Sequence, residues 1–83
     1  MKVNVRYFAS LREALGAGEA VETTPGATVG HVRDALISRG GAHAEVLART
    51  RAVRTALDQV LCDDRALLRD GAELAFFPPV TGG

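Results

Sequence analysis

Hydrophobic and polar residues alternate over residues 2–8, near the start of the chain. Val3, Val5 and Tyr7 fall on one side of an extended segment, whereas Phe8 falls on the other side. A repeat of two residues that is rich in β-branched and aromatic side chains is typical of a strand buried on one face. The pattern therefore predicts a first strand whose core side excludes Phe8.

Two helices and a second strand are expected next. Ser10 and Glu13 have the spacing of a capping box, which predicts a short helix that the following glycines end. Residues 19–24 predict a strand that pairs with the first one as a hairpin. Thr28 is a favourable N-cap for one longer amphipathic helix, which ends at the glycines 40–41. The expected buried side of this helix consists of Val29, Val32, Ala35 and Leu36.

Three further strand patterns occupy the second half of the chain, over residues 51–57, 60–62 and 73–77. Turns are predicted at residues 58–59 and 70–71, where aspartate is followed by glutamine or glycine. The apolar residues expected to pack inward here are Leu67, Leu68, Leu74 and Phe76. Phe77, next to Phe76 in the last strand, is expected on the opposite face.

A hairpin, one long helix and further strands do not fit a simple alternating β-α-β domain. A right-handed crossover through the helix allows the first strand and a late strand to lie parallel in the centre of the sheet. This arrangement is the α+β β-grasp, or ubiquitin-like, fold, a small mixed sheet wrapped around one main helix. We expect a single domain over residues 1–83, with residues 78–83 as an extended C-terminal tail that projects from the fold.

The last residues have the properties of an arm that can enter a narrow opening. Pro78 and Pro79 lack a backbone N–H, so they end the ladder pairing and favour an extended, polyproline-like path. Gly82 and Gly83 carry no side chain, so the terminal carboxylate sits on the slimmest backbone that a protein can form. A frayed terminus is the alternative. The aromatic pair 76–77 and the double proline ahead of the glycines favour a projecting tail.

The composition limits the classes of partner. The chain has 83 residues, of which 47% are hydrophobic, enough for one compact core. A formal net charge of zero argues against a nucleic-acid partner, which requires a basic excess. No apolar run is long enough to span a bilayer and no signal peptide is evident, so we expect a cytoplasmic protein without a membrane partner. Cys62 is the only cysteine, which excludes an internal disulfide.

The sequence contains no self-contained active site. His31 and His43 lack the supporting residues of a catalytic triad, and together with Cys62 they cannot form a structural zinc site, so we expect no metal and no bound cofactor. The remaining candidate is the carboxylate of Gly83, which becomes reactive when it is activated, for example as an acyl-adenylate. On this interpretation the protein is a co-substrate, and its partners supply the catalytic groups.

Three segments of the chain resemble the small, sulfur-carrier subunit of molybdopterin synthase. Residues 76–83, Phe-Phe-Pro-Pro-Val-Thr-Gly-Gly, are similar to that family's C-terminal signature over its whole length. Residues 5–13 and 70–74 resemble its N-terminal pattern and the turn before its last strand, so the likeness covers essentially the whole domain. Asp58 is a departure, because the family commonly has an asparagine ahead of the glutamine at this turn. A local turn hydrogen bond and a partner contact are therefore left open.

The resemblance implies a function for the tail. An adenylating enzyme akin to the ubiquitin activators would use ATP to form an acyl-adenylate on Gly83, and sulfur from a persulfide donor would replace AMP to leave a thiocarboxylate. The tail, including Thr81 and Gly82, would then enter the large synthase subunit. There it would donate sulfur to cyclic pyranopterin monophosphate in molybdenum cofactor biosynthesis. The family's complex is a heterotetramer of two small and two large subunits.

A docking face is also expected. If the strand alternation holds, Phe8, Leu61 and Phe77 lie on the sheet surface away from the helix, and exposed large apolar groups of this kind mark interfaces. The alternative is that the twist of the sheet carries some of them into the core. The expected partner interface consists of Phe8, Arg12, Leu61, Phe77, Pro78, Pro79 and Val80.

Other functions remain open at this stage. A sulfur carrier for thiamine or for tRNA thiolation shares the fold and the Gly-Gly end, although the tails of thiamine carriers resemble residues 76–79 less. A ubiquitin-like modifier would attach to lysines through the same activated carboxylate. A plain binding module would carry no chemistry on its tail. Deleting Gly83 separates these classes, because carriers and modifiers lose their function whereas a binding module keeps its affinity.

Overall fold

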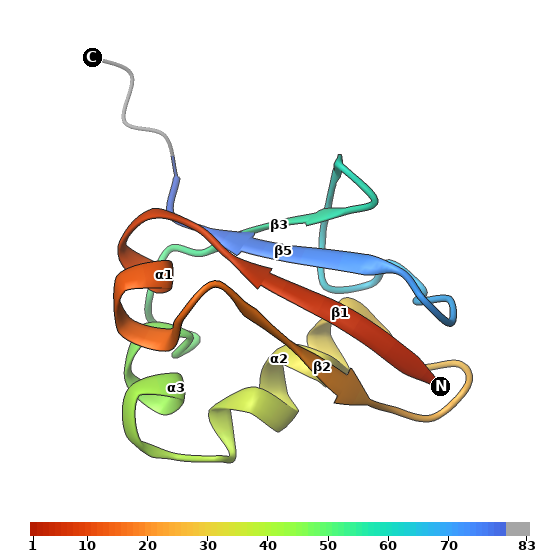
Figure 1. Cartoon of the computed structure of the whole chain (residues 1–83), viewed down its shortest axis with the longest axis horizontal. Coiled ribbons are helices and arrows are strands. Elements are labelled where there is room, and N and C mark those ends of the chain that lie inside the picture. Colours follow the sequence, from red (N-terminus) through yellow and green to blue (C-terminus); the bar gives the residue numbers. More distant parts are fainter. Residues whose placement is uncertain (80–83) are drawn as a thin grey trace.

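The computed structural model describes residues 1–79, and that part of the chain forms five strands and three helices (Figure 1). In chain order they are β1 (Lys2–Tyr7), α1 (Ala9–Leu15), β2 (Gly18–Glu22), α2 (Val29–Ile37), α3 (Gly41–Val46), β3 (Arg54–Leu57), β4 (Val60–Cys62) and β5 (Glu73–Phe77). Each strand that the sequence predicts is present. The second and third strands are shorter than predicted, and α2 ends three residues before Gly40.

The five strands form one mixed sheet in the order β2-β1-β5-β3-β4 (Figure 1). β1 and β5 are parallel neighbours in its centre, with Val5 beside Leu74 and Tyr7 beside Phe76. The other three pairs of neighbouring strands are antiparallel. The predicted α+β arrangement, with the first and last strands parallel in the centre of the sheet, is confirmed.

Most of the core residues that come from the sheet are inward-facing side chains of the two central strands. Val3, Val5 and Tyr7 of β1 are at most 1% exposed, and Leu74 and Phe76 of β5 are 0% exposed. The rings of Tyr7 and Phe76 stack with their centroids 6.2 Å apart. The predicted alternation is therefore confirmed in both strands.

α2 packs on this core through a stripe in which residues three and four positions apart share one side of the helix. Val29, Val32 and Leu36 are each at most 1% exposed. Ala35, expected on the same side, is exposed. The position that completes the stripe belongs instead to Arg33, which is only 6% exposed. A charged residue thus occupies a core position that the hydrophobic pattern does not reveal.

Arg33 is buried because the segment that follows α3 satisfies its guanidinium. Its Nε donates to the carbonyl oxygen of Leu47 at 2.8 Å, and its Nη2 donates to that of Ala48 at 2.8 Å. Burial lowers the pKa of Arg33, but the guanidinium keeps its charge because its ordinary pKa is so high. The side chain therefore ties the connection between α3 and β3 to the side of α2.

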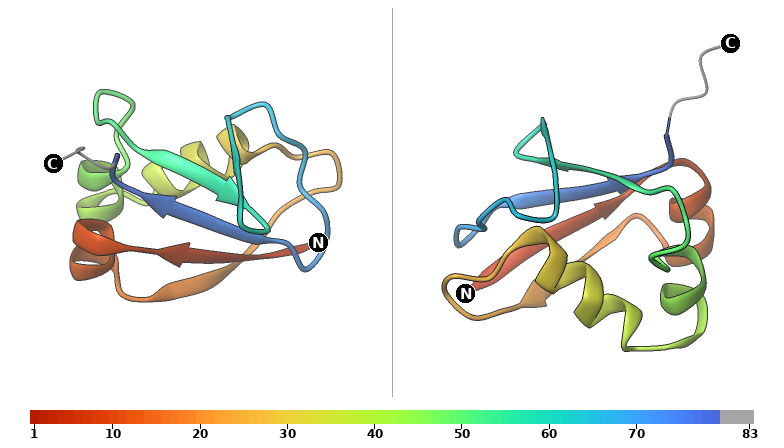
Figure 2. Two further views of the ribbon diagram at one scale, coloured as in Figure 1. Left: turned by 90° about the horizontal axis from the view of Figure 1, so that it is seen from above. Right: turned by 180° about the vertical axis from the view of Figure 1, so that it is seen from behind.

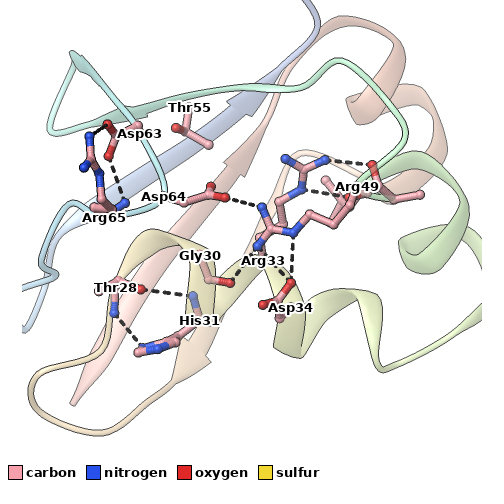
Figure 3. A network of polar contacts seen from close by, with 12 residues as sticks. Thr28, Gly30, His31, Arg33, Asp34, Arg49, Thr55, Asp63, Asp64 and Arg65 are labelled. Atoms are coloured by element: carbon pink, nitrogen blue, oxygen red, sulfur yellow. Dashed lines mark hydrogen bonds and ion pairs between the residues drawn. The ribbon is translucent and has the colours of Figure 1, made fainter.

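Arg49 joins the same connection to two further segments (Figure 3). Its guanidinium pairs with Asp34 of α2, at 2.8 Å from Nη2 to Oδ1, and with Asp64 of the loop after β4. That loop comes close to α2, since a Cβ added to Gly30 would lie only 3.1 Å from the Cβ of Asp64. Glycine at position 30 therefore permits the close approach of the Asp64 loop to α2, and a larger residue would force the two segments to shift.

The start of α2 has the predicted cap. The Oγ1 of Thr28 accepts a hydrogen bond from the backbone N–H of His31 at 3.2 Å, and Nδ1 of His31 accepts one from the backbone N–H of Thr28 at 3.1 Å (Figure 3). The two side chains satisfy each other's backbone donors, as in a capping box. His31 therefore has a structural role at this helix end.

The capping box expected at Ser10 and Glu13 is wrong. The N-cap lies two residues earlier than predicted, at Phe8, so α1 begins at Ala9 and has no side-chain cap. The reason is that strand pairing continues through Phe8, whose backbone N–H donates to the carbonyl oxygen of Phe76 at 3.1 Å. The chain then turns at once into the helix through Ala9, at the unusual φ of 53°.

α2 and α3 lie on one side of the sheet, and no helix of residues 1–79 covers the opposite side (Figure 2). We call this uncovered side the outer face. β5 ends at the end of the sheet where α1 lies, whereas the N-terminus lies at the opposite end, where β1 begins (Figure 1). The tail therefore starts next to α1, at the end of the sheet farthest from Lys2.

Replacing Leu68 by alanine should destabilise the fold, whereas the same change at Leu67 should not. Both leucines were expected to pack inward, but Leu68 is 6% exposed and Leu67 is 66% exposed. Leu68→Ala should lower the free energy of unfolding by about 2–5 kcal/mol, and Leu67→Ala should change it by less than about 0.5 kcal/mol. Urea denaturation of both variants measures the difference, and equal losses would contradict the burial assignment.

Candidate functional site

The described part of the tail begins where β5 ends. Phe77 is the last residue of β5, and Pro78 and Pro79 follow it, all three half-buried. Residues 80–83 lie outside the described residues, so the expected roles of Val80, Thr81, Gly82 and Gly83 remain predictions. The site that can be built from the structure is the surface around the base of the tail.

Two aromatic side chains flank the base of the tail on the outer face. Phe77 is opposite Arg54 in the β3–β5 ladder, and it faces away from buried Phe76 because successive strand residues point to opposite sides. Phe8 directly follows Tyr7, the partner of Phe76 in the β1–β5 ladder, and it is 38% exposed. The two aromatics therefore occupy neighbouring positions on one face.

The register of the sheet connects Phe77 to Leu61 across two strands. Ala75, two residues before Phe77, lies opposite Ala56 of β3, and Ala56 lies opposite Leu61 of β4. Leu61 is 68% exposed. The side chains of these two alanines are small, so they protrude less from the sheet than those of Phe77 and Leu61. We call these five residues the apolar strip: Phe8, Phe77, Ala75, Ala56 and Leu61.

The structure therefore brings Phe8, Leu61 and Phe77 onto one uncovered face, as the strand alternation predicts. Whether they bind a partner remains a prediction. Val60 is an additional exposed apolar residue, 68% exposed and adjacent to Leu61, that the sequence argument did not include. Its exposure follows from its place in a three-residue edge strand, which cannot be deduced from its hydrophobicity.

Arg6 and Arg54 border the apolar strip, and Arg12 lies on the neighbouring helix α1. The guanidinium carbon of Arg6 lies 5.7 Å from the centroid of the Phe8 ring, and its Nη1 lies 3.3 Å from Oε1 of Glu73. Arg54 is opposite Phe77 in the ladder, and Arg12 is an exposed residue of α1. Of these three, the sequence argument proposed only Arg12. The period-two pattern, which puts Arg6 on the side of Phe8, was a usable signal for Arg6.

The turn at Asp58 and Gln59 is present, and the aspartate makes its own hydrogen bonds. Both residues have positive φ, 49° and 69°, as a tight two-residue hairpin turn requires. Oδ1 of Asp58 accepts from the backbone N–H of Glu73 at 3.0 Å, and Oδ2 accepts from Nη2 of Arg69 at 2.7 Å. The hydrogen bond from Glu73, helped by Arg69, lowers the pKa of Asp58.

A second polar cluster joins β1, β2, α3 and the end of α2 around Glu19. Its Oε2 accepts from the hydroxyl of Tyr7 at 2.8 Å and from Nε2 of His43 at 2.9 Å, and its Oε1 pairs with Arg39. Burial alone would raise the pKa of Glu19, but the hydrogen bonds from Arg39, His43 and Tyr7 outweigh it and lower the pKa to about 2. A carboxylate held so firmly in its ionised form is a poor proton acceptor.

The pKa of Tyr7 shifts in the opposite direction from that of Glu19. Burial, together with its hydrogen bond to Glu19, raises the pKa of the Tyr7 hydroxyl, so this hydroxyl stays protonated and acts as a donor. The ring of His43 packs edge-on against Tyr7, with the centroids 6.3 Å apart. The cluster therefore holds the sheet and the α3 region together.

Other kinds of site are not apparent in the part of the chain that the structure describes. Residues 1–79 contain no group of three or more histidine, cysteine, aspartate or glutamate side chains arranged to hold a metal ion. Their surface has no pocket. None of the helices in this range is long and apolar enough to cross a membrane. The apolar strip and its arginines are the most distinctive surface feature.

Comparisons with known proteins point to one family. The model of the ThiS family matches residues 5–83, nearly the whole chain, including the two terminal glycines. The chain is also 36% identical over 81 residues to the molybdopterin synthase sulfur carrier subunit of Haemophilus influenzae. That alignment covers 98% of this chain and 99% of the relative.

Two solved structures have the same β-grasp fold. SAMP1 from Haloferax volcanii, a small archaeal modifier protein, has a TM-score of 0.79 and 28% identity, with 100% of both chains covered. A chain in the complex of subunits 1 and 2 of molybdopterin-converting factor from Helicobacter pylori has a TM-score of 0.73 and 26% identity, again over 100% of both chains. The predicted ubiquitin-like fold is confirmed, and so is the resemblance to the sulfur-carrier subunit of molybdopterin synthase.

Replacing Glu19 by glutamine should weaken the dependence of stability on acidic pH. The pKa of Glu19 falls from an ordinary value of 4.5 to about 2 on folding, so its ionised form stabilises the fold above pH 4.5. This contribution is lost as the pH falls from 4.5 towards 2. Over that window the free energy of unfolding should drop more in the wild type than in Glu19→Gln, as measured by urea denaturation.

Glu13→Gln, at an exposed position of α1, is the matched control and should keep the wild-type pH dependence. At neutral pH, Glu19→Gln should already be the less stable of the two variants, because the amide cannot replace the charged acceptor of three donors. Identical pH profiles for the wild type and Glu19→Gln would contradict the assignment.

Proposed function

Because this chain belongs to the ThiS family, we propose that it is the sulfur carrier subunit of a molybdopterin synthase. The observation that carries the proposal is the full-length similarity to proteins of that name, which extends to the terminal Gly-Gly. The proposal gives the functional role to the carboxylate of Gly83. The folded domain serves to hold and present the tail.

The proposed chemistry proceeds through activation of the tail by a partner. A ubiquitin-activator-like adenylating enzyme transfers AMP from ATP to the carboxylate of Gly83 and releases pyrophosphate. The outer sulfur of a persulfide donor then attacks the acyl carbon and displaces AMP, and a thiol reduces the resulting acyl disulfide, breaking its S–S bond to leave a terminal thiocarboxylate. The β-grasp domain contributes no proton acceptor to these steps. Its two central polar clusters, around Glu19 and around Arg33, are occupied with structural hydrogen bonds.

The proposed delivery step takes place on the large synthase subunit, in a heterotetramer of two small and two large subunits. The tail enters that subunit and donates its sulfur to cyclic pyranopterin monophosphate. The solved complex of subunits 1 and 2 of molybdopterin-converting factor supports a partner of this kind. In this proposal the apolar strip docks on the partner, because its exposed leucine and aromatic side chains adjoin the base of the tail.

A ubiquitin-like modifier is the second candidate function. The similarity to SAMP1, a small archaeal modifier protein, favours it, because that protein has the same fold over its full length. A modifier uses the same activated carboxylate, but its product is an amide bond to a lysine of another protein. A carrier instead ends as a free thiocarboxylate, so the two functions differ in the mass of the product.

Incubation with the adenylating enzyme, ATP and a persulfide donor should increase the intact mass of the protein by one oxygen exchanged for sulfur. Mass spectrometry measures this change, and a variant that lacks Gly83 should show none. Adding the large subunit and cyclic pyranopterin monophosphate should return the mass to that of the carboxylate. An unchanged mass, with the enzyme active on another carrier, would contradict a sulfur carrier. Conjugates to lysines would instead support the modifier.

Replacing Leu61 by alanine should weaken binding to the large subunit without destabilising the fold. Leu61 is 68% exposed and belongs to the apolar strip, whereas Leu67 is 66% exposed and lies in the loop near α2. Leu61→Ala should lower the affinity by about tenfold, as truncation of a well-packed interface residue does. Leu67→Ala is the control and should bind within about twofold of the wild type. Calorimetry measures both, and equal affinities would count against the strip as the docking surface.

A further inference from the structure

Two arginines near the base of the tail have no carboxylate partner among residues 1–79. Within residues 1–79, six arginines form ion pairs with glutamate or aspartate, and Arg12 and Arg54 are absent from those pairs. Both are exposed. The side chains of other exposed arginines, such as Arg69 and Arg65, are held by Asp58 and Asp63. The two unpaired guanidinium groups are therefore concentrated at one end of the sheet.

Their positions follow from the backbone. Arg54 is directly opposite Phe77 in the ladder, so its side chain leaves the sheet on the outer face, beside the last residue of β5. Arg12 lies in the first half of α1, and its backbone N–H donates to the carbonyl oxygen of Phe8, the N-cap, at 3.4 Å. Arg54 therefore adjoins Phe77 in the sheet, and the backbone of Arg12 adjoins Phe8.

Among residues 1–79, the carboxylate side chains are mostly engaged away from Arg12 and Arg54. The chain has equal numbers of acidic and basic residues, and eight of the ten acidic side chains are in ion pairs. The other two are Asp70, which accepts from the backbone N–H of Lys2 at the far end, and Glu13. Glu13 follows Arg12 on α1, but one residue turns a helix by about 100°, so the two side chains diverge.

We propose that Arg12 and Arg54 bind carboxylates that surround the tail-accepting opening of the large subunit. The proposal rests on the proposed function, and it adds the charge of the partner surface. The apolar strip would form the desolvated centre of the interface, and the two arginines its charged rim. A nucleic acid is not favoured, because two unpaired arginines on a chain of zero net charge fall far short of a phosphate-binding surface.

Rim charges act mainly on the rate of association. Opposite charges steer two proteins together before the apolar surfaces touch, and salt screens this steering. Removing both guanidinium groups should therefore slow association and reduce its dependence on salt, with little effect on dissociation. A purely structural role for the two arginines would instead lower stability and leave the salt dependence unchanged. The two explanations thus predict different measurements.

The experiment compares the wild type with an Arg12→Gln/Arg54→Gln double variant in stopped-flow association with the large subunit. At about 0.1 M salt, where the screening length is about 10 Å, the double variant should associate about tenfold more slowly. At about 1 M salt, where the screening length falls to about 3 Å, the two rates should converge. Urea denaturation should give the two proteins equal stability.

Lys2→Gln is the matched control. Lys2 is exposed, carries no ion pair among residues 1–79, and lies on the outer face at the opposite end of β1. It changes the net charge by one, like each single arginine substitution, and should leave the association rate within about twofold of the wild type. Arg54→Lys should retain most of the wild-type rate in the background of native Arg12, because a lysine keeps the charge.

The outcomes separate the inference from the proposed function. If the wild type binds and Leu61→Ala weakens it, but the double variant associates at the wild-type rate in low salt, the arginine inference is overturned and the apolar docking surface stands. An equal slowing by Lys2→Gln would also overturn it, because net charge rather than position would then be responsible. If the wild type itself does not bind the large subunit, the proposed function fails. The arginine inference is also overturned if the double variant associates more slowly than the wild type by the same factor at low and at high salt.

Discussion

The parallel pairing of β1 and β5 is the constraint on which the rest of the structure depends. It makes neighbours of residues 4 and 73, so almost the whole chain is the connection between two adjacent strands. Parallel strands cannot be joined by a tight turn, and their crossover passes over one face of the sheet. α2 and α3 consequently lie on one side (Figure 2). The same pairing makes β5 end beside the start of α1, and so decides where the tail leaves.

The two faces of the central strands have separate roles because side chains alternate along a strand. Tyr7 and Phe76 are stacked in the core, and the residues that follow them, Phe8 and Phe77, are on the outer face. A core side chain thus fixes the backbone position of the exposed side chain next to it. Changes on the outer face can alter recognition while the core stays packed, which makes the surface around the tail separable from stability.

The sequence was sufficient for the strands, the order of elements and the face that carries Phe8 and Phe77, because these depend on local period and on short turns. It was insufficient where a distant partner decides. Arg33 completes the buried stripe of α2 only because carbonyl groups 14 and 15 residues later accept its hydrogen bonds. Phe8 takes the cap position from Ser10 because β5 pairs with it. Leu67 and Leu68 are the same residue type, and only the fold decides that Leu68 is buried and Leu67 is exposed.

The polar groups of the domain also bear on where any chemistry must take place. No buried side-chain nitrogen or oxygen of residues 1–79 lacks a hydrogen-bond partner. Glu19 is saturated by three donors, which stabilise its ionised form, and Arg33 is saturated by backbone carbonyls. A group so engaged must break native contacts before it can accept or donate a proton, so each is unsuited to catalysis. On the proposed function, a reaction at the terminal carboxylate requires catalytic groups from the partner, and the exposed apolar strip is the surface proposed to bind it.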